Sequence, residues 1–229
     1  MSDSGESTGL ATEHYIIRGG AEGRDRLRVL SRVMRPSTDR FLARIAVPTG
    51  SVCLDAGCGG GEVARMLAAR TGPTGRVVGI DVDPVSALTA LVRAGRPGST
   101  VAIEDVDFAG HFCHPEHPAF SRYCEVYAAS AIGRGADPYI GRRLPSMFAA
   151  AGLIDIEVHV EQPAGFDPDV KAMAPLTMAA IGEAVVTAGL VTNEEVNGLV
   201  EQLWEFAEQP FSIMSVPRIV QVSGRVPFT

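Results

Sequence analysis

The chain has 229 residues and a formal net charge of −7, so no broad basic surface is expected and nucleic acid is excluded as the expected substrate. Hydrophobic residues make up 46% of it, enough for one domain with a proper core, with or without an appended helical subdomain. No signal peptide or bilayer-spanning apolar run is evident, and the four cysteines follow no disulfide framework. We therefore expect a cytoplasmic protein without membrane contact.

The first segment of the chain is polar and then helical. Residues 1–12 are expected to be disordered, and residues 13–46 to form N-terminal helices. Leu27, Leu30, Val33 and Met34 recur at helical spacing with arginines between them. We predict a second helix over Ser37–Ile45.

The most informative stretch is residues 51–82. A short apolar run ends on Asp55, and four glycines follow at positions 57, 59, 60 and 61. A helix-forming segment comes next, and a second apolar run, Val77–Ile80, ends on Asp81. This order predicts strand, glycine turn, helix and strand, a unit that binds adenosine-type ligands at the carboxyl ends of parallel strands. We predict a nucleoside-binding core over residues 51–108; a tight turn that binds nothing would not explain why both strands end on aspartate.

The glycine spacing distinguishes between nucleoside ligands. A dinucleotide fingerprint requires glycine where Glu62 stands, which disfavours a nicotinamide oxidoreductase. The pattern D-x-G-C-G-x-G, from Asp55 to Gly61, instead resembles the first motif of class I S-adenosylmethionine-dependent methyltransferases of the small-molecule type. The resemblance implies a Rossmann-like, mostly parallel α/β sheet with helices on both faces, an antiparallel last strand and a helical cap.

The resemblance also implies roles for individual residues toward S-adenosylmethionine. Asp55 would order the turn and contact the cofactor, and Asp81 would bind the ribose. The remaining cofactor-binding candidates in this stretch are Gly57, Cys58, Gly59, Gly61 and Val82. The leader around Tyr15 and Arg18 resembles a segment that reaches the methionine end of the cofactor. An ordinary amphipathic helix with a solvated basic face explains that leader equally well.

One departure from the family lies in the middle of the chain. Only 18 residues (100 − 81 − 1) separate Asp81 from Thr100, and a helix with its turn occupies nearly all of them. A strand–helix–strand unit alone needs about 30 residues. We therefore expect the stretch corresponding to the third and fourth strands to be missing. Either the fifth strand closes up beside the first, or another chain fills the sheet, or the chain is a deletion relic.

Weak catalytic candidates follow the strand predicted over Thr100–Phe108. At its carboxyl end, Asp105, Asp107 and His111 could orient an acceptor or take its proton, although helix-capping carboxylates and a backbone-bonded histidine are at least as probable. Histidines and cysteines gather nearby, but their spacing matches no zinc motif, so we expect no metal site. They are His111, His114, His117, Cys113 and Cys124.

The C-terminal half predicts a helix over Asp137–Leu153, a strand over Ile154–Val160, and a last strand over Ser215–Val222. Residues 116–134 and 171–209 are expected to form the helical cap, with a capping box at Thr192 and Glu195. The whole of 13–229 is read as one methyltransferase-like domain.

The expected function is methyl transfer from S-adenosylmethionine to an oxygen, nitrogen or carbon nucleophile of a small molecule. Two alternatives stay open: a binding or regulatory protein of the same fold without transfer, and a non-methylating relative such as a cyclase. The expected partner is a small-molecule acceptor, and a homodimer is an alternative to a monomer.

Overall fold

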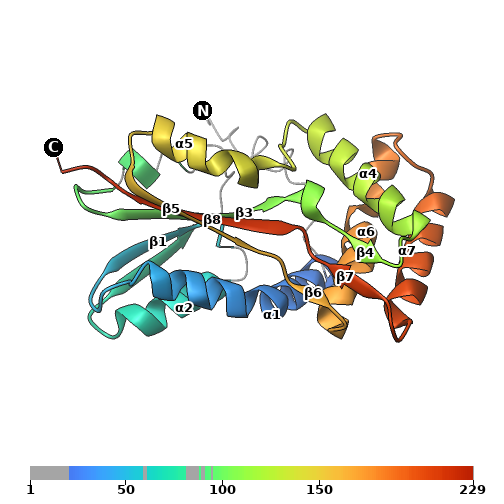
Figure 1. The fold of residues 1–229 in the computed structure, drawn as a ribbon, viewed down its shortest axis with the longest axis horizontal. Helices are drawn as coiled ribbons and strands as arrows, with labels where there is room; N and C mark the ends of the chain where they lie inside the picture. Colours follow the sequence, from blue (N-terminus) through green and yellow to red (C-terminus); the bar gives the residue numbers. More distant parts are fainter. Residues whose placement is uncertain (1–20, 59–60, 81–87, 89–90, 94, 229) are drawn as a thin grey trace, which may run out of the picture.

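The computed structural model describes residues 21–58, 61–80, 88, 91–93 and 95–228. Helices α1 and α2 lie against one side of the strands, α5 lies on the other, and α4, α6 and α7 gather at one end (Figure 1). The helices are α1 (Ala21–Arg44), α2 (Glu62–Thr71), α4 (Pro118–Gly133), α5 (Leu144–Ala150), α6 (Pro168–Thr187) and α7 (Asn193–Glu208), with the short 3-10 helices η1 (Phe108–Gly110) and η2 (Ile140–Arg143). The strands are β1 (Val52–Ala56), β2 (Arg76–Ile80), β3 (Thr100–Asp107), β4 (Cys113–His114), β5 (Ile154–Glu161), β6 (Ala164–Gly165), β7 (Ile213–Ser215) and β8 (Arg218–Arg225).

The expected sheet is divided. Within the described residues β1 pairs only with β2, in parallel, from Val52 opposite Arg76 to Ala56 opposite Ile80. A separate sheet has the order β3-β8-β5, with β8 antiparallel to both neighbours. The expectation of one mostly parallel sheet is therefore corrected, whereas the α/β class and the antiparallel last strand are confirmed. Strand β3 does not close up beside β1, which removes the first of the three outcomes expected for the shortened middle.

Helix α1 connects the two sheets. Near its end, Leu42 packs with Met66 and Leu67 of α2, beneath the β1–β2 pair. Earlier in the helix, Met34 packs with Met173 of α6 and Ile219 of β8. Polar contacts add to this second interface: the Thr38 hydroxyl donates to Glu104 Oε1 at 2.8 Å, and Ser37 Oγ accepts from Gln221 Nε2 at 2.9 Å.

The prediction of two N-terminal helices was wrong, because α1 is continuous and contains Pro36. A proline removes one helical hydrogen bond and usually bends or ends a helix. Here the residues after it, Ser37, Thr38, Phe41 and Leu42, are all buried. Their packing holds the helix together past the proline, so tertiary contacts outweigh the local preference.

Most other elements lie where they were expected. The cap helices α4 and α7 fall within the predicted segments, α6 begins three residues before its segment, at Pro168, and β5 matches its predicted strand to within one residue. The predicted helix over 137–153 is shorter, formed by η2 and α5. Thr192 caps α7 by accepting from Glu195 N at 3.2 Å, while the Glu195 side chain pairs with Arg122 at 2.8 Å. The helix predicted before Gly95 lies largely outside the described residues, as do Tyr15 and Arg18.

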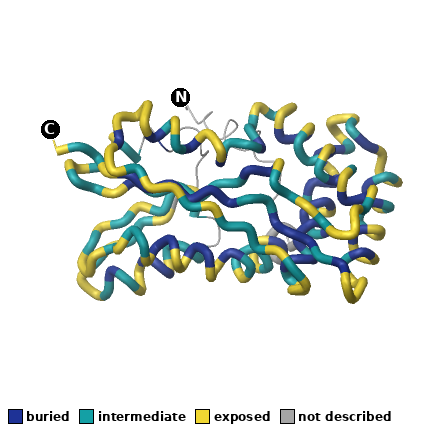
Figure 2. Tube along the Cα trace, viewed as in Figure 1, coloured by how far each residue is buried: buried dark blue, intermediate teal, exposed yellow. Residues whose placement is uncertain are grey.

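Buried residues concentrate along β8 and between the cap helices (Figure 2). The cap core contains Tyr123, Met178, Leu203 and Phe206, all almost completely buried. Among the described residues, α6 alone is long and apolar enough to cross a membrane, yet 67% of that window is buried inside the structure. Its composition is accounted for by packing against the other helices of the cap.

Candidate functional site

The glycine turn joins β1 to α2. Gly57, directly after β1, has φ +83°, and Gly61, the N-cap of α2, has φ +76°. Both values lie in the left-handed region that glycine enters without steric cost. Gly61 N donates to Cys58 O at 2.7 Å and closes the turn. A Cβ placed on Gly57 would meet no atom within 4 Å, so open space borders the backbone there.

Asp55 lies beside this turn and is only partly satisfied. Its carboxylate accepts a hydrogen bond from the backbone N–H of Ala64 in α2, while burial raises its pKa above the ordinary value. The second oxygen, Oδ2, is buried without a hydrogen-bond partner. An unpaired buried carboxylate oxygen costs free energy unless a donor reaches it. The turn thus combines an open backbone with an unused acceptor, which suits a ligand rich in hydrogen-bond donors.

The remaining turn candidates divide between described and undescribed residues. Cys58 packs its Sγ against β2, where a Cβ on Gly79 would lie 3.0 Å from the sulfur. Cys58 therefore fixes the distance between the turn and β2. Gly59, Asp81 and Val82 lie outside the described residues.

At the carboxyl end of β3, successive side chains lie on opposite faces of the sheet. Val106 and Phe108 line a cavity of about 70 Å³ beneath the cap. Asp107, one residue out of phase, is buried in ion pairs with Arg142 of η2 and Arg218 of β8, each with a contact of 3.1 Å. It holds η2 against the sheet and faces away from the cavity.

Asp105 shares the face of Asp107. Its Oδ1 accepts from Val106 N at 2.7 Å, and burial raises its pKa. A Cβ on Gly141 of η2 would lie 2.9 Å from the Asp105 carbonyl oxygen, so η2 covers this part of the strand. Of the three weak catalytic candidates, the structure places only His111 in the cavity.

His111 lies among aromatic rings and next to a thiol. Its ring contacts those of Phe108 and Phe120 edge-on, with centroids 5.0 and 4.8 Å apart. Its Nδ1 is 3.9 Å from Cys124 Sγ, and its Nε2 is buried without a hydrogen-bond partner. Burial lowers the His111 pKa to about 4, so the ring is neutral near pH 7.

Sequence reasoning missed two polar residues of this cavity as site candidates, Arg26 of α1 and Thr177 of α6. Arg26 is 8% exposed, and its Nε donates to Thr177 Oγ1 at 3.0 Å. One signal was available, since Arg26 precedes Leu30 and Val33 by four and seven residues and therefore lies on their apolar helix face. Nothing local marks Thr177.

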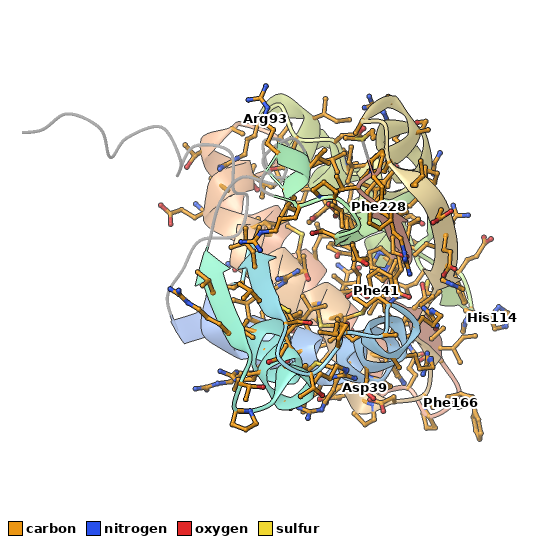
Figure 3. The ribbon with its side chains drawn as sticks, turned by 90° about the vertical axis from the view of Figure 1, so that its left-hand side faces the viewer. Asp39, Phe41, Arg93, His114, Phe166 and Phe228 are labelled. Carbon is orange, nitrogen blue, oxygen red and sulfur yellow. The ribbon has the colours of Figure 1, made fainter. Side chains whose placement is uncertain are left out.

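The histidine and cysteine cluster does not assemble in this structure. Within the part of the chain that is described, no group of three His, Cys, Asp or Glu side chains could hold a metal ion. His114 points outward from the surface (Figure 3). A larger cavity of about 460 Å³ opens beside Arg44, Thr100 and Arg225, at the amino end of β3. It lies at the opposite end of that strand from His111, and the residues that line it differ from those that line the smaller cavity.

The glycine turn, the α/β order and the cap agree with the resemblance to S-adenosylmethionine-dependent methyltransferases, and a sequence comparison finds a methyltransferase relative. It is 31% identical over 152 residues to nocamycin O-methyltransferase of Saccharothrix syringae. This alignment covers 66% of the chain and 52% of the relative, so the chain spans about half the length of the curated relative it matches. The methyltransferase resemblance is thereby confirmed. No protein-family model matches the chain.

Solved structures give a weaker likeness. Phosphoethanolamine N-methyltransferase 2 of Haemonchus contortus aligns in two structures, one with phosphomonomethylethanolamine and S-adenosylhomocysteine and one with S-adenosyl-L-methionine. The TM-scores are 0.44 and 0.40 at 16% identity, covering 94% of this chain and 55% and 54% of those chains. At TM-scores below 0.5, residues of those enzymes cannot be mapped onto this site.

Proposed function

We propose that the chain binds S-adenosylmethionine and transfers its methyl group to an oxygen, nitrogen or carbon nucleophile of a small molecule. The observation that carries this proposal is the turn from Asp55 to Gly61, with its positive-φ glycines opening on α2, in a chain related to an O-methyltransferase. The donor supplies a methyl group made electrophilic by a sulfonium.

The residues of the turn fit such a ligand. Gly57 leaves room for close approach to the backbone, and Asp55 Oδ2 offers an unused acceptor. Asp81 would bind both ribose hydroxyls as a charged acceptor, while Tyr15 and Arg18 would hold the methionine end. Methyl transfer is an in-line displacement that depends on orientation and exclusion of water. Buried apolar walls beneath the cap, such as Phe108 and Met173, serve that exclusion.

The acceptor would bind at the carboxyl end of β3, close to His111. A neutral imidazole can hydrogen-bond or receive the proton that an oxygen or nitrogen nucleophile loses. Asp107 is tied to two arginines and is less suited to that role. We further propose a small-molecule acceptor, no nucleic acid or membrane partner, a cytoplasmic location, and a monomer or homodimer.

A second candidate is a protein that binds S-adenosylmethionine without transferring its methyl group. The divided sheet favours this candidate, since among the described strands nothing fills the place between β1 and β3. That place would otherwise frame the meeting point of donor and acceptor.

Calorimetric titration with S-adenosylmethionine, S-adenosylhomocysteine and NADH tests the proposal. We expect both S-adenosyl ligands to bind and NADH to fail. Asp81→Ala should weaken S-adenosylmethionine binding by more than about tenfold, because a bidentate charged hydrogen bond is lost.

Absence of S-adenosyl binding in a well-folded sample would refute the proposal. An unchanged affinity in Asp81→Ala would refute the ribose assignment alone. Binding without transfer to any member of a broad acceptor panel would favour the second candidate.

A further inference from the structure

The cavity beneath the cap contains a buried positive charge. Arg26 is 8% exposed and lines the cavity together with His111, Tyr123 and Thr177. Among the carboxylates of residues 39–58, 62–80 and 100–228, none lies within ion-pair distance of Arg26, although Arg32, Arg40 and other arginines have such partners. A buried cation is normally paired or hydrogen-bonded, because removing it from water is costly.

Thr177 orients this charge. Its hydroxyl accepts from Arg26 Nε at 3.0 Å, which fixes one edge of the guanidinium. A guanidinium has five N–H donors in a planar fork, so one bond to a neutral hydroxyl leaves most of its hydrogen-bonding capacity for other acceptors.

His111 provides a second polar atom in the same cavity. Burial raises the pKa of the neighbouring Cys124 to about 12, so this thiol keeps its proton and can donate it to His111 Nδ1, 3.9 Å away. In that arrangement the neutral ring carries its own proton on Nε2. Nε2 is buried without a hydrogen-bond partner of good geometry, so it offers an N–H donor to a ligand; an interaction of the ring with the Ser215 backbone only partly offsets the lowering of the His111 pKa by burial.

The rest of the cavity favours a small ligand group. Burial also raises the pKa of Tyr123, which keeps its phenol protonated. Apolar side chains such as Leu30, Val106 and Met173 form the remaining walls. The volume of about 70 Å³ holds a few water molecules, at about 10–15 Å³ for each, or one head group of carboxylate size.

From this geometry we propose that the cavity is a subsite for a small anionic oxygen group, a carboxylate or an enolate, bound by the Arg26 guanidinium and the His111 imidazole. The proposal rests on the proposed function in one respect: the anionic group would belong to the methyl acceptor. The acceptor would then be an acid, and its charge would be neutralised by Arg26 in a site closed to water.

The test uses acetate as the probe and acetamide as its uncharged control, followed by NMR of the Arg26 Nε–Hε and His111 ring signals at constant ionic strength. We expect saturable shifts with acetate and none with acetamide. Arg26→Met should weaken acetate binding at least about tenfold, because a charge-assisted bidentate contact is lost. Arg35→Met, which removes an exposed arginine from the same helix, should leave acetate binding unchanged.

Equal binding of acetate and acetamide, absence of saturable shifts, or unchanged binding in Arg26→Met would each overturn the proposal. If Arg26→Met fails to fold, Arg26→Lys and Thr177→Val replace it; each should weaken acetate binding, and unchanged binding in both would overturn the proposal. Calorimetry with S-adenosylmethionine separates the two claims. Acetate binding without S-adenosylmethionine binding would refute the proposed function alone, and the reverse result would refute the anionic subsite alone.

Discussion

Gly57 holds its main chain at φ +83°, where an L side chain is strained, and it borders open space. Gly57→Ala should therefore lower the free energy of unfolding by about 1 kcal/mol through backbone strain. The added methyl would also occupy the space that the proposed cofactor needs, so S-adenosylmethionine binding should weaken several-fold. Urea denaturation and calorimetry measure the two effects.

Gly135 gives a matched control for Gly57. Its φ is +78°, and a Cβ there would also meet no atom within 4 Å, but it follows α4 in the cap. Gly135→Ala should cost similar stability and leave ligand binding intact. Equal loss of binding in both variants would mean that strain, rather than contact at the turn, controls affinity.

His111 should make folding stability depend on pH. Its pKa falls from 6.5 to about 4 on folding, so between these values the unfolded chain binds the extra proton. The contribution of neutral His111 to the free energy of unfolding should therefore be fully present above pH 6.5. It should decrease as the pH falls toward 4 and not change further below pH 4. The full contribution is roughly 3 kcal/mol, because each pKa unit corresponds to about 1.4 kcal/mol.

The measurement compares urea denaturation of wild type and His111→Phe from pH 7 to pH 4. Phenylalanine keeps the ring contacts with Phe108 and Phe120 and does not titrate. The variant should lose less stability on acidification. Asp55, Glu104 and Asp105 have raised pKa values and act in the opposite direction, but they are common to both proteins and cancel in the difference. Parallel pH curves would show that His111 is not buried in solution.

At the scale of elements, the β1–β2 pair with α2 is the least supported unit. It rests on α1 through a small cluster that includes Leu42 and Met66. Val52 and Leu54 of β1 remain 79% and 41% exposed, although both are apolar. Strand β8, in contrast, is paired on both edges and buried along most of its length.

Hydrogen exchange should reveal this difference. We expect backbone amides of β1 and β2 to exchange at least about tenfold faster than those of β8, because local opening exposes little buried surface there. Peptides spanning 52–56, 76–80 and 218–225, analysed by mass spectrometry, measure the rates. Added S-adenosylmethionine should slow exchange in β1, because a ligand stabilises the state it binds. Uniform protection across the three peptides would contradict the prediction.

Other exposed apolar side chains lie at the cap end of the molecule. Phe166, before α6, is 61% exposed and points outward in Figure 3, whereas Phe41 of α1 is 4% exposed and lies in the interior. The exposed fractions of the two side chains differ because α1 packs against both sheets, whereas Phe166 lies in a surface connection before α6.

At the scale of the whole molecule, the described strands show a break between the β1–β2 pair and the β3-β8-β5 sheet. Both halves that border the break remain ordered, because each packs independently on α1. The chain also spans about half of its curated relative.

Much of the fold could be predicted because its signals are local. The alternation over 154–160 identified β5, the Thr192 cap identified the start of α7, and the glycine spacing identified the turn after β1. The continuity of helix α1 through Pro36 could not be predicted, because the contacts that stabilise the helix after this proline come from residues far away in the chain. The faces of β3 follow from a period of two, but which face would contain a cavity depends on where α1 and α6 pack.

The glycine turn, its methyl-donor type of spacing and the short interval between Asp81 and Thr100 could be recognised in the amino-acid sequence, because each depends on residue type over a few positions. The three-dimensional structure was needed to see that β3 stays apart from β1, that Asp107 is held by two arginines, and that Arg26 and His111 line the same cavity. These outcomes depend on packing between segments separated by scores of residues. Such contacts arise when α1, α4 and α6 bury their apolar faces together, and no local pattern specifies them.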